Sequence, residues 1–192
     1  VPRSYLAELL RDDLAPWIAN PQKVSTALDL CTGSGCLAVL LAHSFPRATI
    51  DAADISRDAL KVARRNVADY RLQHRIRLIA SDLFAALAGR RYDLIVASHV
   101  QFGTGHIFDG IEALAALARP EGPWVLIDGY HGFMATPTDL SGVAGRVFYV
   151  AGGYKYAMAG EGACFLHAPD GFGARPVITG WFAEFGDLSG PP

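Results

Sequence analysis

Two glycines, Gly33 and Gly35, lie between a short apolar segment and an apolar helical pattern, in the order Asp29-x-x-x-Gly33-x-Gly35. Glycine has no side chain, so the backbone of such a turn can come close to a ligand, and the free amide groups of the following helix point toward that ligand. The spacing differs from the dinucleotide pattern Gly-x-Gly-x-x-Gly, because Cys31 and Cys36 stand at glycine positions. The turn therefore predicts a site for a nucleotide-type ligand.

Two acidic residues stand where the second and third predicted strands end. Asp54 follows Gly33 by 21 residues, and Asp82 comes after the third strand. A carboxylate at the first position can accept both hydroxyls of a ribose, and one at the second lies where an adenine amino group would be. Because the carboxyl ends of parallel strands meet at one edge of a sheet, we expect the turn and both aspartates to line one crevice.

Short apolar runs alternate with helical patterns along the chain. The predicted strands cover residues 26–29, 49–52, 76–79, 93–96, 124–127, 147–150 and 164–166. The predicted helices cover residues 4–18, 36–44, 57–72 and 107–118, with Ser56 as the cap of the third. This alternation predicts an α/β fold, namely a single doubly wound, Rossmann-like three-layer sandwich with about seven mostly parallel strands.

Composition narrows the expected partners. A net charge of -2 gives no basic surface for a phosphate backbone, and the run Leu37 to Ala42 is far too short to span a membrane. Cys31, Cys36 and Cys164 are expected as reduced thiols, with no metal site. We therefore expect a cytoplasmic protein, a monomer or a weak homodimer, that binds a small-molecule cofactor at most and neither nucleic acid nor a membrane.

Several segments of the first half carry a family resemblance. They are Val1-Pro2-Arg3-Ser4, Asp29 to Cys36, Asp54 to Leu60, Ser81 to Phe84 and Tyr92 to Val96. Over residues 1 to about 97 the chain resembles the glutamine N5-methyltransferases that modify release factors and ribosomal protein. The resemblance implies S-adenosylmethionine as cofactor, with Asp29, Gly33 and Gly35 around its methionine part, Asp54 at the ribose and Asp82 at the adenine.

The chain departs from that family directly after the fourth strand. The family has Asn-Pro-Pro-Tyr there, which holds the substrate amide, whereas this chain reads Ser98-His99-Val100-Gln101. Methyl transfer requires the acceptor nitrogen in line with the sulfonium methyl group. The departure therefore predicts that this chain has lost most of the rate acceleration that such positioning gives to methyl transfer.

A second group of segments follows, namely Ser98 to Gly105, Leu126 to His131, Ala151 to Ala159 and Thr179 to Phe182. Over residues 98 to 189 the chain resembles class V aminotransferase-type enzymes, the kynureninase and cysteine or selenocysteine lyase group. This resemblance implies pyridoxal phosphate, with Lys155 forming the Schiff base, Asp128 pairing with the pyridine nitrogen and His131 near the ring. A buried carboxylate and a mobile amine suit that chemistry.

The two resemblances meet at Ser98, which leads to a hypothesis of an artificial chimera built to test fold recombination. It predicts one domain over residues 1–192, made of a methyltransferase-like half (1–97) and a pyridoxal phosphate transferase-like half (98–192). This chimera would have no evolved catalytic activity and would retain only weak binding of S-adenosylmethionine or S-adenosylhomocysteine. Two alternatives stay open, a pyridoxal phosphate-binding lyase or transferase that uses Lys155, and a purely structural scaffold in which Asp128 and Lys155 form a plain ion pair.

Overall fold

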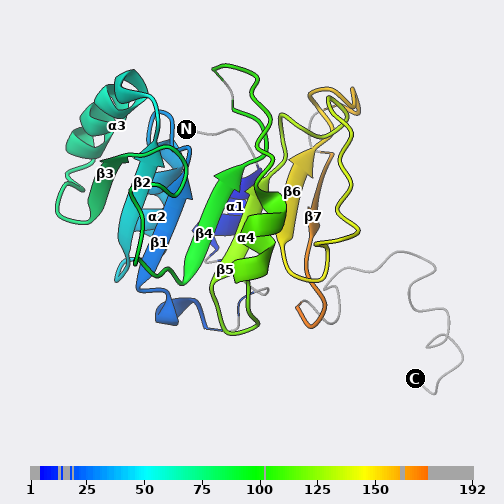
Figure 1. The fold of residues 1–192 in the computed structure, drawn as a ribbon, viewed down its shortest axis with the longest axis horizontal. Coiled ribbons are helices and arrows are strands. Elements are labelled where there is room, and N and C mark those ends of the chain that lie inside the picture. The colour runs from blue at the N-terminus through cyan, green and yellow to red at the C-terminus, as the bar shows by residue number, and fades with distance from the viewer. Residues whose placement is uncertain are drawn as a thin grey trace, which may run out of the picture.

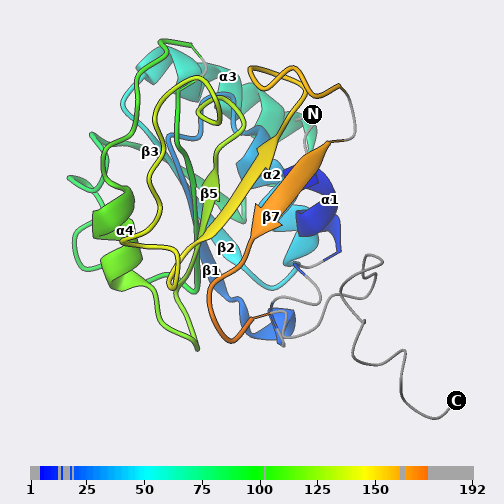
Figure 2. The same ribbon diagram turned by 90° about the vertical axis from the view of Figure 1, so that its right-hand side faces the viewer.

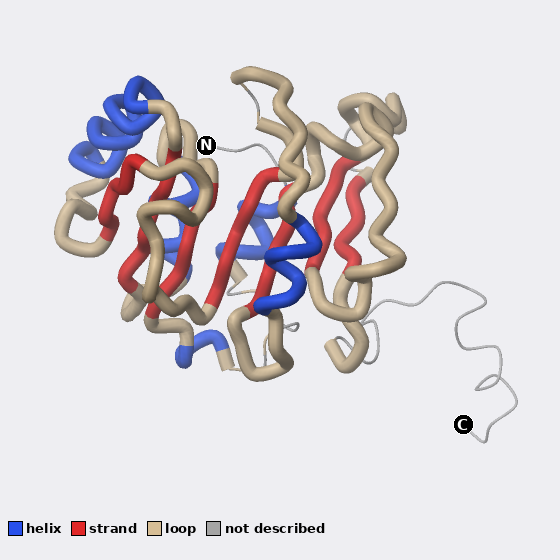
Figure 3. The backbone as a smooth tube through the Cα atoms, viewed as in Figure 1, coloured by secondary structure: helices blue, strands red, loops and turns tan. Residues whose placement is uncertain are grey.

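A seven-stranded sheet runs through the computed structural model, which describes residues 5–12, 14, 18, 20–101, 103–160 and 163–172. Figure 1 shows the strands side by side, and Figure 3 shows the same sheet with helices and loops around it. The strands are β1 (Thr26–Leu30), β2 (Thr49–Asp54), β3 (Ile76–Ala80), β4 (Leu94–Ser98), β5 (Trp124–Asp128), β6 (Phe148–Gly152) and β7 (Cys164–His167).

The strands are arranged in the order β3-β2-β1-β4-β5-β6-β7. All neighbouring pairs are parallel except β6 with β7, which is antiparallel. The chain moves outward from β1 to β3, then returns to the other side of β1 with β4, so the strand order reverses between β1 and β4. In open α/β sheets, ligands bind outside the carboxyl ends of the strands at such a reversal.

Helices cover both faces of the sheet, as Figure 2 shows from the side. On one face lie α1 (Tyr5–Arg11), α2 (Cys36–Ser44) and α3 (Arg57–Asp69), and α4 (Ile111–Leu117) covers the other. Successive strand residues point to opposite faces, and both faces of β4 are buried because Val96 packs toward α1 and α2 while Ile95 packs toward α4. The predicted doubly wound, mostly parallel α/β fold is therefore confirmed.

The seven predicted strands are confirmed within two residues at each end. Three helices are shorter than predicted, the third of them, predicted over 57–72, ending at Asp69. The pattern over 4–18 forms a helix only at Tyr5–Arg11, and residues 4, 13 and 15–17 lie outside the described part of the chain. The pattern over 107–118 becomes helical only at Ile111, because Ile107 instead forms an antiparallel bridge with Val100.

The predicted boundary between residues 97 and 98 falls at the end of β4, inside the sheet. There β4 pairs with β1 on one side and with β5 on the other. That residues 1–192 form one domain stays a prediction, because residues 173–192 lie outside the described residues. None of the helices in the described part of the chain has the length and apolar character that a membrane span requires.

Candidate functional site

The glycine turn after β1 is built from left-handed backbone. Cys31, Gly33 and Gly35 have φ angles of 61°, 58° and 78°. A Cβ placed on Gly33 would meet no atom of the described residues within 4 Å, so the turn is open at that point, whereas a Cβ on Gly35 would lie 3.0 Å from Cβ of Ala63. Gly33 therefore leaves room for a ligand, and Gly35 allows the start of α2 to pack closely against α3.

Asp54 joins the glycine turn to the start of α3. One carboxylate oxygen accepts a hydrogen bond of 2.8 Å from the backbone N–H of Gly33, and the other accepts one of 2.8 Å from the N–H of Ser56. Ser56 in turn caps α3, since its hydroxyl accepts the N–H of Ala59. An ionised carboxylate offers about four acceptor positions. Asp54 is therefore fixed by two backbone amides and keeps acceptor capacity for a ligand.

Asp29 lies beneath the turn, 1% exposed. Its carboxylate accepts hydrogen bonds from the Thr32 hydroxyl and from the backbone N–H of Ala38 in the first turn of α2. Burial raises the pKa of Asp29 from 3.8 to about 7, and the negative charges of Asp54 and Asp128 add to this rise, while the two hydrogen bonds oppose it. Asp29 thus supports the turn from inside the protein.

A cleft of about 360 Å³ opens at the carboxyl ends of β1, β2 and β3. This volume lies within the ~300–1,000 Å³ usual for small-molecule sites. Both Asp54 and the exposed Asp82 line it, together with Leu30, Cys31, Ala53, Ile55, Ser81, Leu83, Gln101, Thr104, His106, Phe108 and Asp109. The described lining residues do not include Asp29, Gly33 or Gly35. The structure therefore brings two of the five predicted cofactor residues to the cleft itself, and a third, Gly33, donates its backbone N–H to Asp54.

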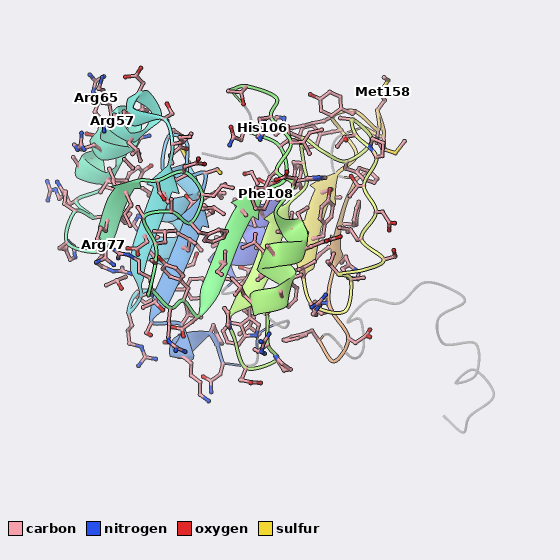
Figure 4. All side chains as sticks on the ribbon, in the orientation of Figure 1. Arg57, Arg65, Arg77, His106, Phe108 and Met158 are labelled. Atoms are coloured by element: carbon pink, nitrogen blue, oxygen red, sulfur yellow. The ribbon has the colours of Figure 1, made fainter. Side chains whose placement is uncertain are left out.

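A hairpin after β4 forms the second wall of the cleft. Val100 bridges Ile107, the Gln101 N–H donates to the His106 carbonyl at 2.9 Å, and the Gln101 side-chain amide donates to Sγ of Cys31 at 3.6 Å. Figure 4 shows His106 above the ends of the strands and Phe108 lower, beside the end of β4. Sequence reasoning missed this wall, although Gly103 and Gly105 between the paired residues are a hairpin signal.

The segment that replaces Asn-Pro-Pro-Tyr is divided between the core and the cleft. His99 is 5% exposed, and its Nδ1 lies 3.3 Å from the hydroxyl of Tyr149. Burial lowers the pKa of His99, which favours the neutral ring. Gln101, two residues on, lines the cleft. Of the polar side chains between Ser98 and Gln101, all of them described, only that of Gln101 therefore lines the cleft.

The residues predicted for pyridoxal phosphate lie at the ends of β5 and β6. The Lys155 ammonium contacts Nε2 of His131, and Asp128 accepts the N–H of Tyr130 at 3.1 Å. Burial lowers the pKa of Lys155 and raises that of Asp128. Among the ion pairs of the described residues, none joins Asp128 to Lys155. Lys155 contacts His131 directly, whereas Asp128 and Lys155 interact only through their charges, which raise the pKa of Lys155 and lower that of Asp128 against the effect of burial.

The comparison with protein families identifies a methyltransferase segment. Residues 11–98 match the family described as Methyltransferase small domain. This segment contains the glycine turn, Asp54 and Asp82, so the predicted resemblance of the first half to methyltransferases is supported. The match implies S-adenosylmethionine as the cofactor, as predicted, and gives no support to pyridoxal phosphate.

Curated relatives carry a more specific name. Ribosomal protein uL3 glutamine methyltransferase of Bordetella pertussis is 57% identical over 98 residues, covering 51% of this chain and 33% of that protein. The protein of the same name from Bradyrhizobium diazoefficiens is 45% identical over 135 residues, covering 67% of this chain and 41% of that protein. The chain thus spans between about a third and two fifths of the length of these two relatives.

Solved structures of methyltransferases are also similar. Precorrin-6y C5,15-methyltransferase from Geobacter metallireducens matches with a TM-score of 0.49 and 13% identity, covering 79% of this chain and 63% of that one.

These comparisons overturn three predictions and leave a fourth without support. The artificial chimera, with its description as a designed protein, is wrong, because relatives 57% identical are bacterial proteins and one match covers 67% of the chain, more than residues 1–97 supply. The expectation that the chain is not an enzyme is contradicted by the enzyme names of these relatives. The expectation of no partner beyond a small-molecule cofactor is also wrong, since the relatives are named for a ribosomal protein substrate. Neither the family match nor these relatives support the pyridoxal phosphate roles of Lys155, Asp128 and His131.

Proposed function

We propose that this chain takes part in the transfer of a methyl group from S-adenosylmethionine to the side-chain amide of a glutamine in ribosomal protein uL3. The support is the name shared by relatives 57% and 59% identical to it, together with a cleft that has the groups such a cofactor needs. On this proposal the reaction takes place in the cytoplasm, where ribosomal proteins are made.

The observation that carries the proposal is the position of Asp54. Its carboxylate is held by the amides of Gly33 and Ser56, faces the cleft, and retains free acceptor positions. Such a carboxylate can accept hydrogen bonds from the two neighbouring hydroxyl groups of a ribose. Asp54 would therefore fix the ribose without rearranging, because the two amides already set its orientation.

The remaining cofactor contacts follow from the strand ends. Asp82 lines the cleft after β3 and would accept a hydrogen bond from the amino group of the adenine, while Leu83 would provide apolar contact. The open side of Gly33 would admit the methionine part, and Asp29 would keep the turn in place through Thr32. Gly35 would act through the packing of α2 against α3.

The acceptor amide would approach from the hairpin side of the cleft. Gln101, Thr104 and His106 line that wall and provide both donors and acceptors. When bound, the cofactor supplies an electrophilic methyl group on a sulfonium centre. The role of the protein is then positional, because holding the amide nitrogen close to that methyl group accounts for much of the rate advantage in such reactions.

Transfer of a radiolabelled methyl group to uL3 tests this function. We expect label to appear in uL3 when it is incubated with the chain and labelled S-adenosylmethionine, and to disappear with Asp54→Ala. Asp69→Asn removes an exposed carboxylate at the end of α3 and serves as the matched control. Label at the same level with and without the chain, under conditions where the cofactor binds, would show that the acceptor has been assigned incorrectly.

A further inference from the structure

A second pocket, of about 210 Å³, lies at the opposite edge of the sheet from the cleft. It is formed where β1, β2 and β4 begin, and its walls include Thr26, Thr49 and the side chains of three arginines, Arg77, Arg90 and Arg91. A water molecule takes about 30 Å³ of liquid volume, so the pocket can hold a small polyatomic ion with several waters.

The pocket is organised around one buried carboxylate. Asp51 in β2 is 3% exposed, and it accepts hydrogen bonds from Arg77 Nε at 2.7 Å, Arg90 at 2.9 Å and the Tyr92 hydroxyl at 2.8 Å. A buried carboxylate with three donors fixes the groups that surround it. Asp51 therefore holds two guanidinium groups in set positions on the wall of the pocket.

The arginines retain hydrogen-bonding capacity that Asp51 does not use. A guanidinium has five N–H donors, and among the described residues Arg77 and Arg90 each direct only one of them to a side chain, that of Asp51. The side chains of Arg77 and Arg90 are 61% and 32% exposed, so these donors face solvent at the pocket. Arg91 makes no side-chain hydrogen bond or ion pair with any described residue.

The pocket also has an excess of positive charge. Three arginines line the pocket with Asp51, and a further carboxylate, that of Asp93, accepts hydrogen bonds from the amides and hydroxyls of Ser25 and Thr26. Even with Asp93 included, the arginines outnumber the carboxylates by three to two. A purely structural role for Asp51 accounts for Arg77 and Arg90, which both donate to it, but it does not account for Arg91 at the same pocket.

We propose that this pocket binds a phosphate group, held by Arg77, Arg90 and Arg91. Planar guanidinium groups match the geometry of phosphate oxygens and bind them through paired hydrogen bonds. The same chemistry could come from free phosphate or from the phosphodiester backbone of an RNA. The site is separate from the cofactor cleft, which lies at the carboxyl ends of the strands.

Isothermal titration with inorganic phosphate, at constant ionic strength, tests the site on the whole chain. We expect saturable binding that is weakened roughly 10-fold by Arg91→Gln. Arg91 has no side-chain partner among the described residues, so this variant should melt at the temperature of the unmodified chain. Arg77→Gln should also weaken binding, although it removes a donor from Asp51 and lowers stability.

Arg65→Gln is the matched control, because it removes the same charge from α3, well away from Arg77 in Figure 4. A short single-stranded RNA distinguishes the sources of the phosphate group. For RNA, the logarithm of the binding constant falls linearly with the logarithm of the salt concentration, and each contact with a phosphate of a single strand adds about 0.7 to the steepness of that line. A line that is less steep by about 0.7 in Arg91→Gln therefore identifies a phosphodiester as the ligand. Binding of inorganic phosphate without RNA binding identifies a free phosphate. No saturable phosphate binding, or an equal loss in Arg65→Gln, would overturn the proposal.

Discussion

Replacing Asp29 with asparagine should make the protein more stable at alkaline pH, with little effect at acidic pH. Asp29 is 1% exposed, and burial raises its pKa from 3.8 to about 7. A carboxyl group whose pKa is higher in the folded state stabilises that state most when protonated. Its contribution is therefore fully present below pH 3.8 and declines as the pH rises to about 7.

The size of this effect follows from the two pKa values. The full change is about 4 kcal/mol, at about 1.4 kcal/mol per pKa unit. Of this, about 2.5 kcal/mol falls between pH 5 and pH 8.5, since the unfolded carboxyl is already ionised at pH 5. Asparagine has nearly the same shape and does not titrate. Its carbonyl can still accept a hydrogen bond from the Thr32 hydroxyl, and any change in the bond from the Ala38 N–H adds an offset that is independent of pH.

Urea denaturation of both proteins at pH 5, 6, 7 and 8.5 measures the difference in unfolding free energy. Taking that difference cancels every other titrating group that the two proteins share. We expect the Asp29→Asn protein to gain about 2.5 kcal/mol relative to the unmodified chain across this range, whereas Asp69→Asn, at an exposed site, should give a constant difference. Parallel curves for Asp29→Asn and the unmodified chain would refute the burial of an ionisable Asp29.

Three further substitutions test how the site is supported. Gly35→Ala should destabilise the protein by about 1–3 kcal/mol, because alanine would have to adopt a left-handed conformation and its Cβ would lie 3.0 Å from Cβ of Ala63. Thermal melts measure this loss, and an unchanged melting temperature would contradict the close packing. Arg75→Met should lower the free energy of unfolding by about 1–3 kcal/mol, since the guanidinium donates to three carbonyls in and after α2. A urea midpoint equal to that of the unmodified chain would contradict this prediction. Ser56→Ala removes the cap of α3 and should cost about 1 kcal/mol in the same assay, with no loss if the hydroxyl does not bond the Ala59 amide.

The strands and the glycine turn could be predicted because their signals are local. Apolar runs of four to six residues are typical of strands covered on both faces, and β1, β2, β4, β5 and β6 are buried in that way. The positions of Asp54 and Asp82 follow from parallel strands, whose carboxyl ends meet at one edge. Ser56 was predicted as a cap from its place before an amphipathic pattern, and the structure confirms it.

The contacts that complete the site depend on pairs far apart in sequence. Gln101 reaches Cys31 across 70 residues, and Lys155 reaches His131 rather than Asp128. The role of Gly35 also depends on a distant residue, since only the folded chain places Ala63 next to it. No local pattern encodes these choices, because several polar partners lie within reach at the ends of neighbouring strands.

The cluster at Asp51 shows the same limit. Arg77 in β3 and the neighbouring residues Arg90 and Tyr92 come from two places in the chain, 26 to 41 residues from Asp51. In the sequence Arg77 stands apart from the short Arg90-Arg91 pair, in a chain of net charge -2. Overall charge therefore gave no sign of a local basic pocket.

Calorimetric titration with S-adenosylhomocysteine tests the central claim most directly, because it measures binding at the cleft without requiring the acceptor protein. We predict saturable binding by the unmodified chain and by Asp69→Asn, and a loss of about 10- to 100-fold in affinity in Asp54→Ala, which removes charged hydrogen bonds to the ribose. Absence of binding by the folded chain, or equal binding by Asp54→Ala, would contradict the assignment of this cleft as the cofactor site.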